Sequence, residues 1–357
     1  MRKLRIGQTG PLFFPVPPPK YGGVEKIVYS LCENLTDKGH KVFLFDTEDS
    51  KTRAQLVPVI KKSLYRFTKP VEYTPYFAYE MALIARKAKE LKLDVIHDHL
   101  GPSSLSLYGH LDIPIIHTLH VPFKKEGRAW AYEKLNSKLV SISLAQRKLA
   151  PYLNYVANIY NGIDVENYPF GHKPENYFVW VGELSPRKGI KEVIKIAKIL
   201  KIKLVIIGRI PPPSQPDDYA FFKKYISPDL NKGNIIYIGE KSSEQLKRIY
   251  KKAIAFLFPL QWEEPFGLTM IEALACGTPV VAFKRGSVPE ILKNGKTGFI
   301  VPPFKNNKVN YQGFIEAIRD IGKISRADCR KWAEDNFTAV RMIDEYEKLY
   351  YKILSKS

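Results

Sequence analysis

Residues 253–283 have the sequence AIAFLFPLQWEEPFGLTMIEALACGTPVVAF. The stretch starts with an apolar run (Ala253 to Phe258), continues with apolar residues at helical spacing, and ends with a second apolar run (Pro279 to Phe283). Short apolar runs between turn-forming residues are typical of buried strands, and two strands joined through a helix usually lie parallel in one sheet. This order of elements predicts an α/β fold.

The same alternation extends toward both ends of the chain. Apolar runs predict further strands at residues 4–7, 41–45, 94–97, 114–117, 177–182, 203–208 and 234–239. Apolar residues at helical spacing predict one helix over 24–36, which stops near Gly39, and another over 81–91. Strands and helices in this order predict parallel sheets that are covered by helices on both faces.

A length of 357 residues favours two domains. Turn-forming residues are concentrated between Asn161 and Asn176, so we place the connection between the domains there. The prediction is two doubly wound, Rossmann-like domains, residues 1–160 and 161–337, with two helices in the tail (329–354). Ligands of such domains bind at the C-terminal strand ends, so a ligand that contacts both domains would lie in a cleft between them.

The three cysteines, Cys32, Cys276 and Cys329, are far apart and form no CxxC pair. This spacing indicates neither a disulfide framework nor a thiolate metal site, and it favours a reducing compartment. The N-terminus lacks the apolar segment of a signal peptide, and no run approaches the roughly 18 apolar residues that a membrane span needs. We therefore expect a cytoplasmic protein.

The formal net charge is +20 at pH 7, which favours anionic partners such as phosphates, nucleic acid or an acidic membrane surface. Many lysines lie in helical patterns, as between Lys191 and Lys203, where a solvated outer helix face is the simpler interpretation. The sequence contains no recognised nucleic-acid-binding module and no basic run interleaved with aromatic residues. A basic nucleic-acid-binding protein is therefore an alternative that the charge alone supports.

Two carboxylates flank a Pro-Phe-Gly turn in the opening stretch. Glu264 and Glu272 are eight residues apart, slightly over two helical turns, so we expect both near one side of the segment. Gly267 lets a ligand approach the backbone, and the amides of Phe266, Gly267 and Leu268 would face an anion there. A plain amphipathic helix explains the apolar residues equally well, but it does not explain the two glutamates.

Two loops with glycine or cationic residues also follow predicted strands. Gly22 and Gly23 precede a predicted helix, where a backbone without a Cβ and the positive helix end suit a pyrophosphate. Such a pair is also common in plain turns. In GELSPRKGI (182–190), Arg187 and Lys188 can neutralise a nucleotide diphosphate, and a surface turn is the alternative.

Four histidines, His97, His99, His117 and His120, lie at the ends of two predicted strands. Such a group can be interpreted as a metal site, but no cysteine or carboxylate completes an obvious ligand set. We therefore predict no metal ion, and we expect His97 and His117 to be packed and hydrogen-bonded.

Residues 263–301, EEPFGLTMIEALACGTPVVAFKRGSVPEILKNGKTGFIV, resemble the E-x7-E element of GT-B glycosyltransferases of the retaining family 4 type. The glycine pair at 22–23 and the segment at 182–190 are similar to two further elements of that family, the second being G-R-L-x-x-x-K-G. Lys188 matches the family lysine, whereas Glu183 replaces the usual arginine. The resemblance covers almost the whole chain.

The resemblance implies a role for each candidate residue. Glu264 would orient the transferring sugar, residues 266–268 would contact sugar and phosphate, and Glu272 would hold the ribose. His120 is the closest match to a family histidine that lies near the reacting sugar.

The donor diphosphate would be held by the glycine pair at 22–23 and by Lys188, with Arg187 compensating from a nearby position for Glu183. The C-terminal helix, about 338–357, would cross back to the first domain. By this resemblance the first domain binds the acceptor and the second holds the nucleotide sugar.

The implied reaction is a metal-independent and cofactor-independent transfer of a hexose-type sugar with retention of configuration. The donor would be a UDP-, GDP- or ADP-sugar, and the acceptor a sugar, a lipid-linked molecule or a small molecule, with peripheral contact to an anionic membrane at the inner face. A nucleotide-sugar epimerase on the same fold is the alternative, and the E-x7-E segment argues against it.

Overall fold

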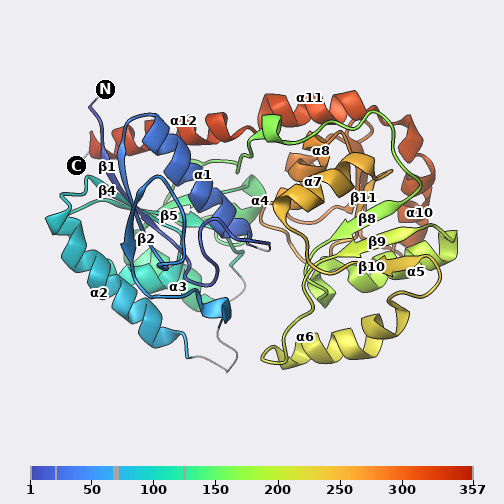
Figure 1. Ribbon diagram of the computed structural model, residues 1–357, viewed down its shortest axis with the longest axis horizontal. Coiled ribbons are helices and arrows are strands. Elements are labelled where there is room, and N and C mark those ends of the chain that lie inside the picture. Colours follow the sequence, from blue (N-terminus) through green and yellow to red (C-terminus); the bar gives the residue numbers. More distant parts are fainter. Residues whose placement is uncertain (1, 21, 67–71, 109, 124–125, 356–357) are drawn as a thin grey trace. The chain divides into compact units, whose positions relative to one another are not determined.

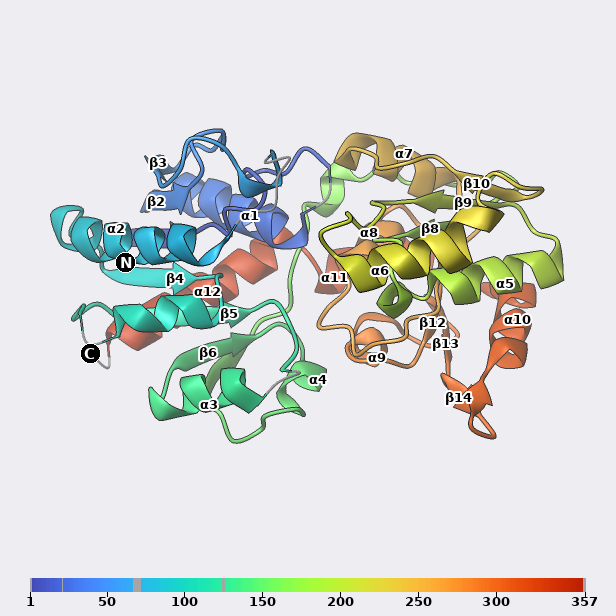
Figure 2. The same ribbon diagram turned by 90° about the horizontal axis from the view of Figure 1, so that it is seen from below.

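The computed structural model describes residues 2–20, 22–66, 72–108, 110–123 and 126–355. The chain forms two compact units, one of Met1–Gly162 with Ala339–Ser357 and the other of Ile163–Thr338. Each unit is built on a parallel β-sheet with helices on both faces (Figure 1, Figure 2). The predicted α/β fold with two Rossmann-like domains is confirmed.

The first unit contains a seven-stranded sheet in the order β3-β2-β1-β4-β5-β6-β7, and all neighbouring strands are parallel. Its strands are β1 (Arg5–Thr9), β2 (Lys41–Asp46), β3 (Gln55–Pro58), β4 (Val95–Asp98), β5 (Ile115–Leu119), β6 (Lys138–Ser141) and β7 (Tyr155–Asn158). The chain runs outward from β1 on one side and from β4 on the other, so the strand order reverses between them. Ligands of doubly wound sheets bind at such a switch point, beyond the C-terminal strand ends.

Helices cover both faces of this sheet. They are α1 (Gly23–Asp37), α2 (Thr74–Glu90), α3 (Glu126–Lys134), α4 (Leu144–Arg147) and α12 (Ala339–Leu354). α1 buries apolar residues at helical spacing, including Ile27 and Leu31, and it ends before Gly39, whose φ of +83° suits glycine. α12 packs against α1 on one face, and α2 and α3 lie on the other (Figure 1).

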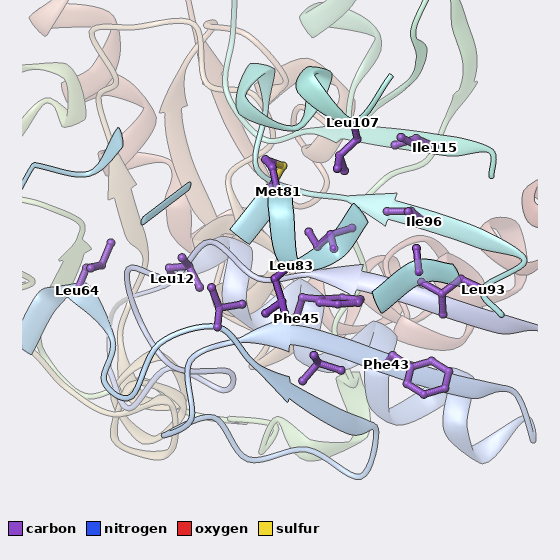
Figure 3. Packing of buried hydrophobic residues seen from close by; sticks show 14 residues of the cluster. Leu12, Phe43, Phe45, Leu64, Met81, Leu83, Leu93, Ile96, Leu107 and Ile115 are labelled. Atoms are coloured by element: carbon purple, nitrogen blue, oxygen red, sulfur yellow. The ribbon is translucent and has the colours of Figure 1, made fainter. Parts of the chain in front are cut away.

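Figure 3 shows the core between the first sheet and α2. Phe45 and Ile96 come from strands and Met81 from α2, and all three are buried. Leu12 and Leu64 belong to the loops after β1 and β3, and the Leu64 amide donates to the Leu12 carbonyl at 2.9 Å. Burying one such side chain contributes about 1.5–3 kcal/mol. The loops at the C-terminal strand ends are therefore anchored to the core.

The second unit contains a six-stranded parallel sheet in the order β10-β9-β8-β11-β12-β13. Its strands are β8 (Phe178–Val181), β9 (Leu204–Ile207), β10 (Ile235–Tyr237), β11 (Phe256–Phe258), β12 (Val280–Phe283) and β13 (Gly298–Val301), and β14 (Phe304–Lys305) pairs with β15 (Lys308–Val309) in a separate hairpin. The strand order reverses between β8 and β11, which places a second switch point at the ends of these strands.

The helices of the second unit are α5 (Ile190–Leu200), α6 (Pro216–Phe221), α7 (Ser243–Lys252), α8 (Leu268–Ala275), α9 (Val288–Ile291), α10 (Tyr311–Arg319) and α11 (Arg326–Asn336). α5 packs against α10, and α8 packs against α7 and α11 (Figure 1). α5 buries Val193 and Ala197 and keeps its lysines on the outer face, as predicted.

The predictions do not include four strands of the two parallel sheets, β3, β6, β7 and β13, or the hairpin β14–β15, and α2 begins at Thr74 rather than at residue 81. Within the described ranges, no helix is both long and apolar enough to cross a membrane. All three cysteines are buried free thiols, in agreement with the prediction that they form no disulfide framework.

Candidate functional site

The switch point of the second unit holds a lysine–glutamate ion pair. Lys188 ends the short 3-10 helix Pro186–Lys188 that follows β8, and Glu264 lies in the loop that follows β11. The Lys188 Nζ lies 2.7 Å from Glu264 Oε2, and the indole Nε1 of Trp262 donates to the same oxygen at 2.9 Å. The ammonium also lies 4.6 Å from the centroid of the Trp262 ring. Two predicted site residues, far apart in sequence, are thus in direct contact.

The turn after Glu264 differs from the prediction. α8 begins only at Leu268, so Glu264 is not part of a helix and does not share a helix face with Glu272. Gly267 caps the helix in the left-handed region with φ +86°, and a Cβ there would lie 2.5 Å from Met270 Cε. The eight-residue spacing therefore does not span two turns of one helix, because the Pro-Phe-Gly turn delays the helix start, and the location of both carboxylates near one side of the segment stays a prediction.

This turn presents backbone rather than side chains. The Phe266 side chain is buried, and its carbonyl accepts a hydrogen bond from Ser287 Oγ at 2.6 Å. Leu268 is the first residue of α8. The first amides of a helix have no acceptor within the helix, and the helix dipole makes this end positive. The amide of Leu268 at the end of this turn can therefore offer an N–H group to an anion.

Glu272 lies within α8 and is buried. The Tyr168 hydroxyl donates to Glu272 Oε1 over a long distance of 3.5 Å. Burial, reinforced by the nearby Glu272 charge, raises the pKa of Tyr168 well above its usual value, so Tyr168 acts as a neutral donor. Tyr168 is thus one partner that holds the Glu272 carboxylate.

Glu183, at the position where the family has arginine, is a buried carboxylate between two guanidinium groups. One of its oxygens accepts from Arg187 and the other from Arg209. The Glu183 side chain is only 1% exposed, whereas those of Arg187 and Arg209 are 41% and 28% exposed. The Arg187 guanidinium also lies 5.6 Å from the Trp262 ring centroid. Glu183 therefore presents two cations toward solvent rather than a negative charge.

Arg209 was missed by the sequence analysis. It follows Gly208 directly after β9, which neighbours β8 in the sheet. The sequence signal that could have identified it is its position directly after a predicted strand, where ligands of such sheets bind. Three cations, Lys188, Arg187 and Arg209, thus lie beyond the C-terminal strand ends of the second sheet. They outnumber the two carboxylates there, those of Glu183 and Glu264. Such an arrangement can bind a polyanion such as a diphosphate.

In the first unit, Gly22 and Gly23 form the start of α1, as their sequence predicts. Gly22 is the N-cap with φ +144°, and Gly23 is the first helical residue. A Cβ on Gly22 would lie 2.6 Å from the Cβ of Pro18 and 2.8 Å from Glu25 Oε2. Burial raises the pKa of Glu25 to about 7. Glycine is therefore required at position 22 by the packing of the proline-rich loop.

Three of the four histidines, His97, His99 and His117, have partners on both ring nitrogens. His97 contacts the hydroxyls of Tyr350 and Thr118, each at 2.7 Å. His117 contacts Asp98 at 3.0 Å and the Tyr108 hydroxyl at 3.1 Å. Both are buried, as expected from the sequence. Among the described residues, no group of three or more His, Cys, Asp or Glu side chains could hold a metal ion.

His120 follows β5 and is half-buried. Its Nε2 lies 2.9 Å from Nδ1 of His99, and the two rings are stacked. Burial lowers the pKa of His120 to about 4, so its imidazole is neutral at neutral pH. It lies beyond a C-terminal strand end of the first sheet, the edge at which such sheets bind ligands.

Comparisons with known proteins agree with this arrangement. Residues 166–335 match the family described as glycosyl transferases group 1, and residues 21–167 match glycosyltransferase family 4. Alpha-maltose-1-phosphate synthase of Mycobacterium tuberculosis is 26% identical over 312 residues, which cover 71% of this chain and 79% of that protein.

Two solved structures show the same fold. Sucrose-phosphate synthase of Thermosynechococcus elongatus has a TM-score of 0.79 at 18% identity and covers all of both chains. HepE of Anabaena, solved in complex with UDP-glucose, has a TM-score of 0.74 at 18% identity and covers 99% of this chain and all of that one.

Proposed function

The chain belongs to the group 1 glycosyltransferases of GT-B fold, and we propose that it transfers a hexose-type sugar from a nucleotide-sugar donor to an acceptor with retention of configuration. The cationic cluster of Lys188, Arg187 and Arg209 at the β8–β11 switch point carries this proposal, because the reaction releases a nucleoside diphosphate. HepE of Anabaena was solved with UDP-glucose, and starch synthase IV of Arabidopsis thaliana with ADP and acarbose, which supports a UDP- or ADP-sugar as donor, and a GDP-sugar is the third candidate.

In the proposed reaction, the bond between the sugar C1 and the phosphate oxygen breaks while C1 bonds to the acceptor hydroxyl oxygen on the same face. The hydroxyl proton passes to the leaving diphosphate. Lys188 and the two arginines stabilise the negative charge on that phosphate without a metal ion, and we also assign the glycine pair at 22–23 to the donor diphosphate. No organic cofactor takes part.

The remaining residues orient the sugar and the nucleotide. Lys188 and Trp262 already hold Glu264, so its carboxylate is positioned to accept a hydrogen bond from a sugar hydroxyl. We assign Glu272 to the ribose, residues 266–268 to sugar and phosphate, and His120 to the vicinity of the reacting sugar.

We assign acceptor binding to residues 1–160 with the C-terminal helix, and donor binding to residues 161–337. The acceptor is a sugar, a lipid-linked molecule or a small molecule. We place the enzyme in the cytoplasm, with peripheral contact to the anionic inner membrane face. The net charge of +20 supports that contact, as do Trp130 and Tyr152 in the first unit, which are 60% and 62% exposed.

The test is a donor screen by thermal shift and slow donor hydrolysis with UDP-, GDP- and ADP-sugars. The wild type is compared with Lys188→Ala and Glu272→Ala, and with Lys296→Ala as an exposed lysine control in the second unit. We expect one nucleotide family to stabilise the wild type and the control but neither site variant. No stabilisation of the wild type by any donor would refute the proposal, and conversion of the donor to another nucleotide sugar without acceptor would identify an epimerase.

A further inference from the structure

A continuous chain of hydrogen bonds connects α12 with His120 inside the first unit. We call it the Gln8 network. Its contacts are Tyr346 to Thr118 at 2.9 Å, Thr118 to His97 at 2.7 Å, His97 to Tyr350 at 2.7 Å, Tyr350 to Gln8 at 3.4 Å, Gln8 to His99 at 2.9 Å, and His99 to His120 at 2.9 Å. All of its members except His120 are buried.

The network determines which ring nitrogen of His120 carries the proton. Gln8 directs its carbonyl oxygen Oε1 at His99 Nε2, and a carbonyl oxygen only accepts, so His99 Nε2 must carry a hydrogen. Burial lowers the pKa of His99 well below its usual value, so the ring is neutral and its Nδ1 is a lone-pair acceptor. The proton between the two rings therefore belongs to His120 Nε2.

The other half of the network agrees with this direction of Gln8. Its amide Nε2 donates to the Tyr350 hydroxyl at 3.4 Å, which leaves the Tyr350 hydrogen available to His97 Nδ1, 2.7 Å away. Burial raises the pKa of Tyr350 well above its usual value, so that hydroxyl keeps its hydrogen. The ring centroids of His97 and Tyr346 are 4.7 Å apart, which keeps His97 in place. With the Gln8 amide reversed, its carbonyl would accept the Tyr350 hydrogen, and the protons of His97, His99 and His120 would each have to lie on the other ring nitrogen.

We propose that Tyr350 and Gln8, acting through His99, are positioning residues that hold His120 in the tautomer with its proton on Nε2 and its lone pair on Nδ1. In this form the free nitrogen of His120 accepts a hydrogen bond from a sugar hydroxyl, whereas the opposite tautomer would present an N–H group. The inference rests on the proposed role of His120 near the reacting sugar. It assigns a function in the reaction to α12 through the buried hydroxyl of Tyr350.

The test uses a matched pair of tyrosines on α12. Tyr350→Phe removes a hydroxyl from the network, and Tyr351→Phe removes the neighbouring hydroxyl, which donates to the Arg2 carbonyl at 2.7 Å outside it. With the sugar donor that the wild-type protein uses, we expect Tyr350→Phe to lower kcat about tenfold and to change KM less than twofold. The reason is that the lost hydroxyl positions His120 and does not bind the donor. Tyr351→Phe should retain both constants, and Gln8→Met should reproduce Tyr350→Phe.

Side-chain 15N NMR of the wild-type protein supplies a readout that a purely structural role would not change. We expect His120 to carry its proton on Nε2 in the wild type and in Tyr351→Phe, and to populate the other tautomer in Tyr350→Phe. A wild-type His120 with its proton on Nδ1 overturns the inference, even if Tyr350→Phe does not fold. If His120→Ala loses activity while Tyr350→Phe is as active as Tyr351→Phe, the inference about the Gln8 network is wrong but the proposed function is not affected. A wild type without activity toward any donor refutes the proposed function instead.

Discussion

Replacing Lys188 by methionine tests whether the lysine–glutamate pair at the β8–β11 switch point is a buried, energetically coupled unit. Removing one partner of a buried ion pair costs about 3–5 kcal/mol, because the other charge is left without compensation. The side chains of Lys188 and Glu264 are 16% and 9% exposed, and Trp262 still donates to Glu264 in the variant. We therefore expect Lys188→Met to destabilise the second unit by about 2–3 kcal/mol.

Glu264→Gln should cost less, about 1 kcal/mol, because the ammonium left behind still packs on the Trp262 ring. The double variant Lys188→Met/Glu264→Gln leaves no unpaired charge and should also cost only about 1 kcal/mol. The two substitutions should thus be strongly non-additive, with a coupling of about 2–3 kcal/mol.

The assay is urea unfolding of the four proteins, together with thermal unfolding, in which Lys188→Met should lower the Tm of the second unit by roughly 5–10 °C. The control is Lys323→Met in the same unit, where Lys323 pairs with Asp320 at the same distance of 2.7 Å but with side chains 73% and 50% exposed. Exposed pairs contribute little, so the control should change Tm by less than about 2 °C. Additive effects, or equal effects of Lys188→Met and the control, would refute the reasoning.

Three further predictions concern other parts of the structure. Arg209→Ala should weaken binding of a nucleoside diphosphate about tenfold but of the monophosphate less than threefold in calorimetry, and equal losses would contradict a phosphate-specific role. Burial raises the pKa of Asp46 from 3.8 to about 8, so the folded state keeps a proton that the unfolded state loses. Stability from this group therefore falls between about pH 4 and pH 8, and Asp46→Asn should flatten the pH dependence in urea unfolding; an unchanged slope would contradict this. Gly267→Ala should lower stability by about 1–2 kcal/mol because of its positive φ, whereas Gly322→Ala, with open space around it, should be neutral in thermal unfolding; equal effects would argue against strain at the turn.

The sequence predicts best those strands that are buried on both faces. Strands such as β12 (Val280–Phe283) are entirely apolar, because helices cover the sheet on both sides. Of the four strands of the parallel sheets that were not predicted, three, β3, β7 and β13, are at sheet edges, where partial exposure permits polar residues and shortens the apolar run. Apolar periodicity therefore identifies the centre of such a fold more readily than its edges.

The candidate site was predictable as a set of residue types but not as a geometry. Motif spacing singled out Lys188 and Glu264, yet only the strand order brings these two side chains to 2.7 Å. The helical spacing of Glu264 and Glu272 was misleading because Gly267 starts the helix late.

Partners contributed by distant segments left no local signal. Gln8 and Tyr350 are 342 positions apart in the chain, and nothing in either neighbourhood indicates their contact. Arg209 looks like an ordinary residue after a strand until its contact with Glu183 is seen.

The placement of α12 in the first unit has a consequence for how this chain folds during its synthesis. α1, β1 and β4 leave the ribosome early, but the helix that buries Met342, Tyr346 and Tyr350 against them is translated only after the whole second unit. At about 5–20 residues per second, the nascent first unit waits roughly 10–40 s with its α12-facing apolar surface uncovered. The second unit is continuous in sequence, so it is fully translated before α12 of the first unit. The first unit is therefore the first to be translated and the last to be completed.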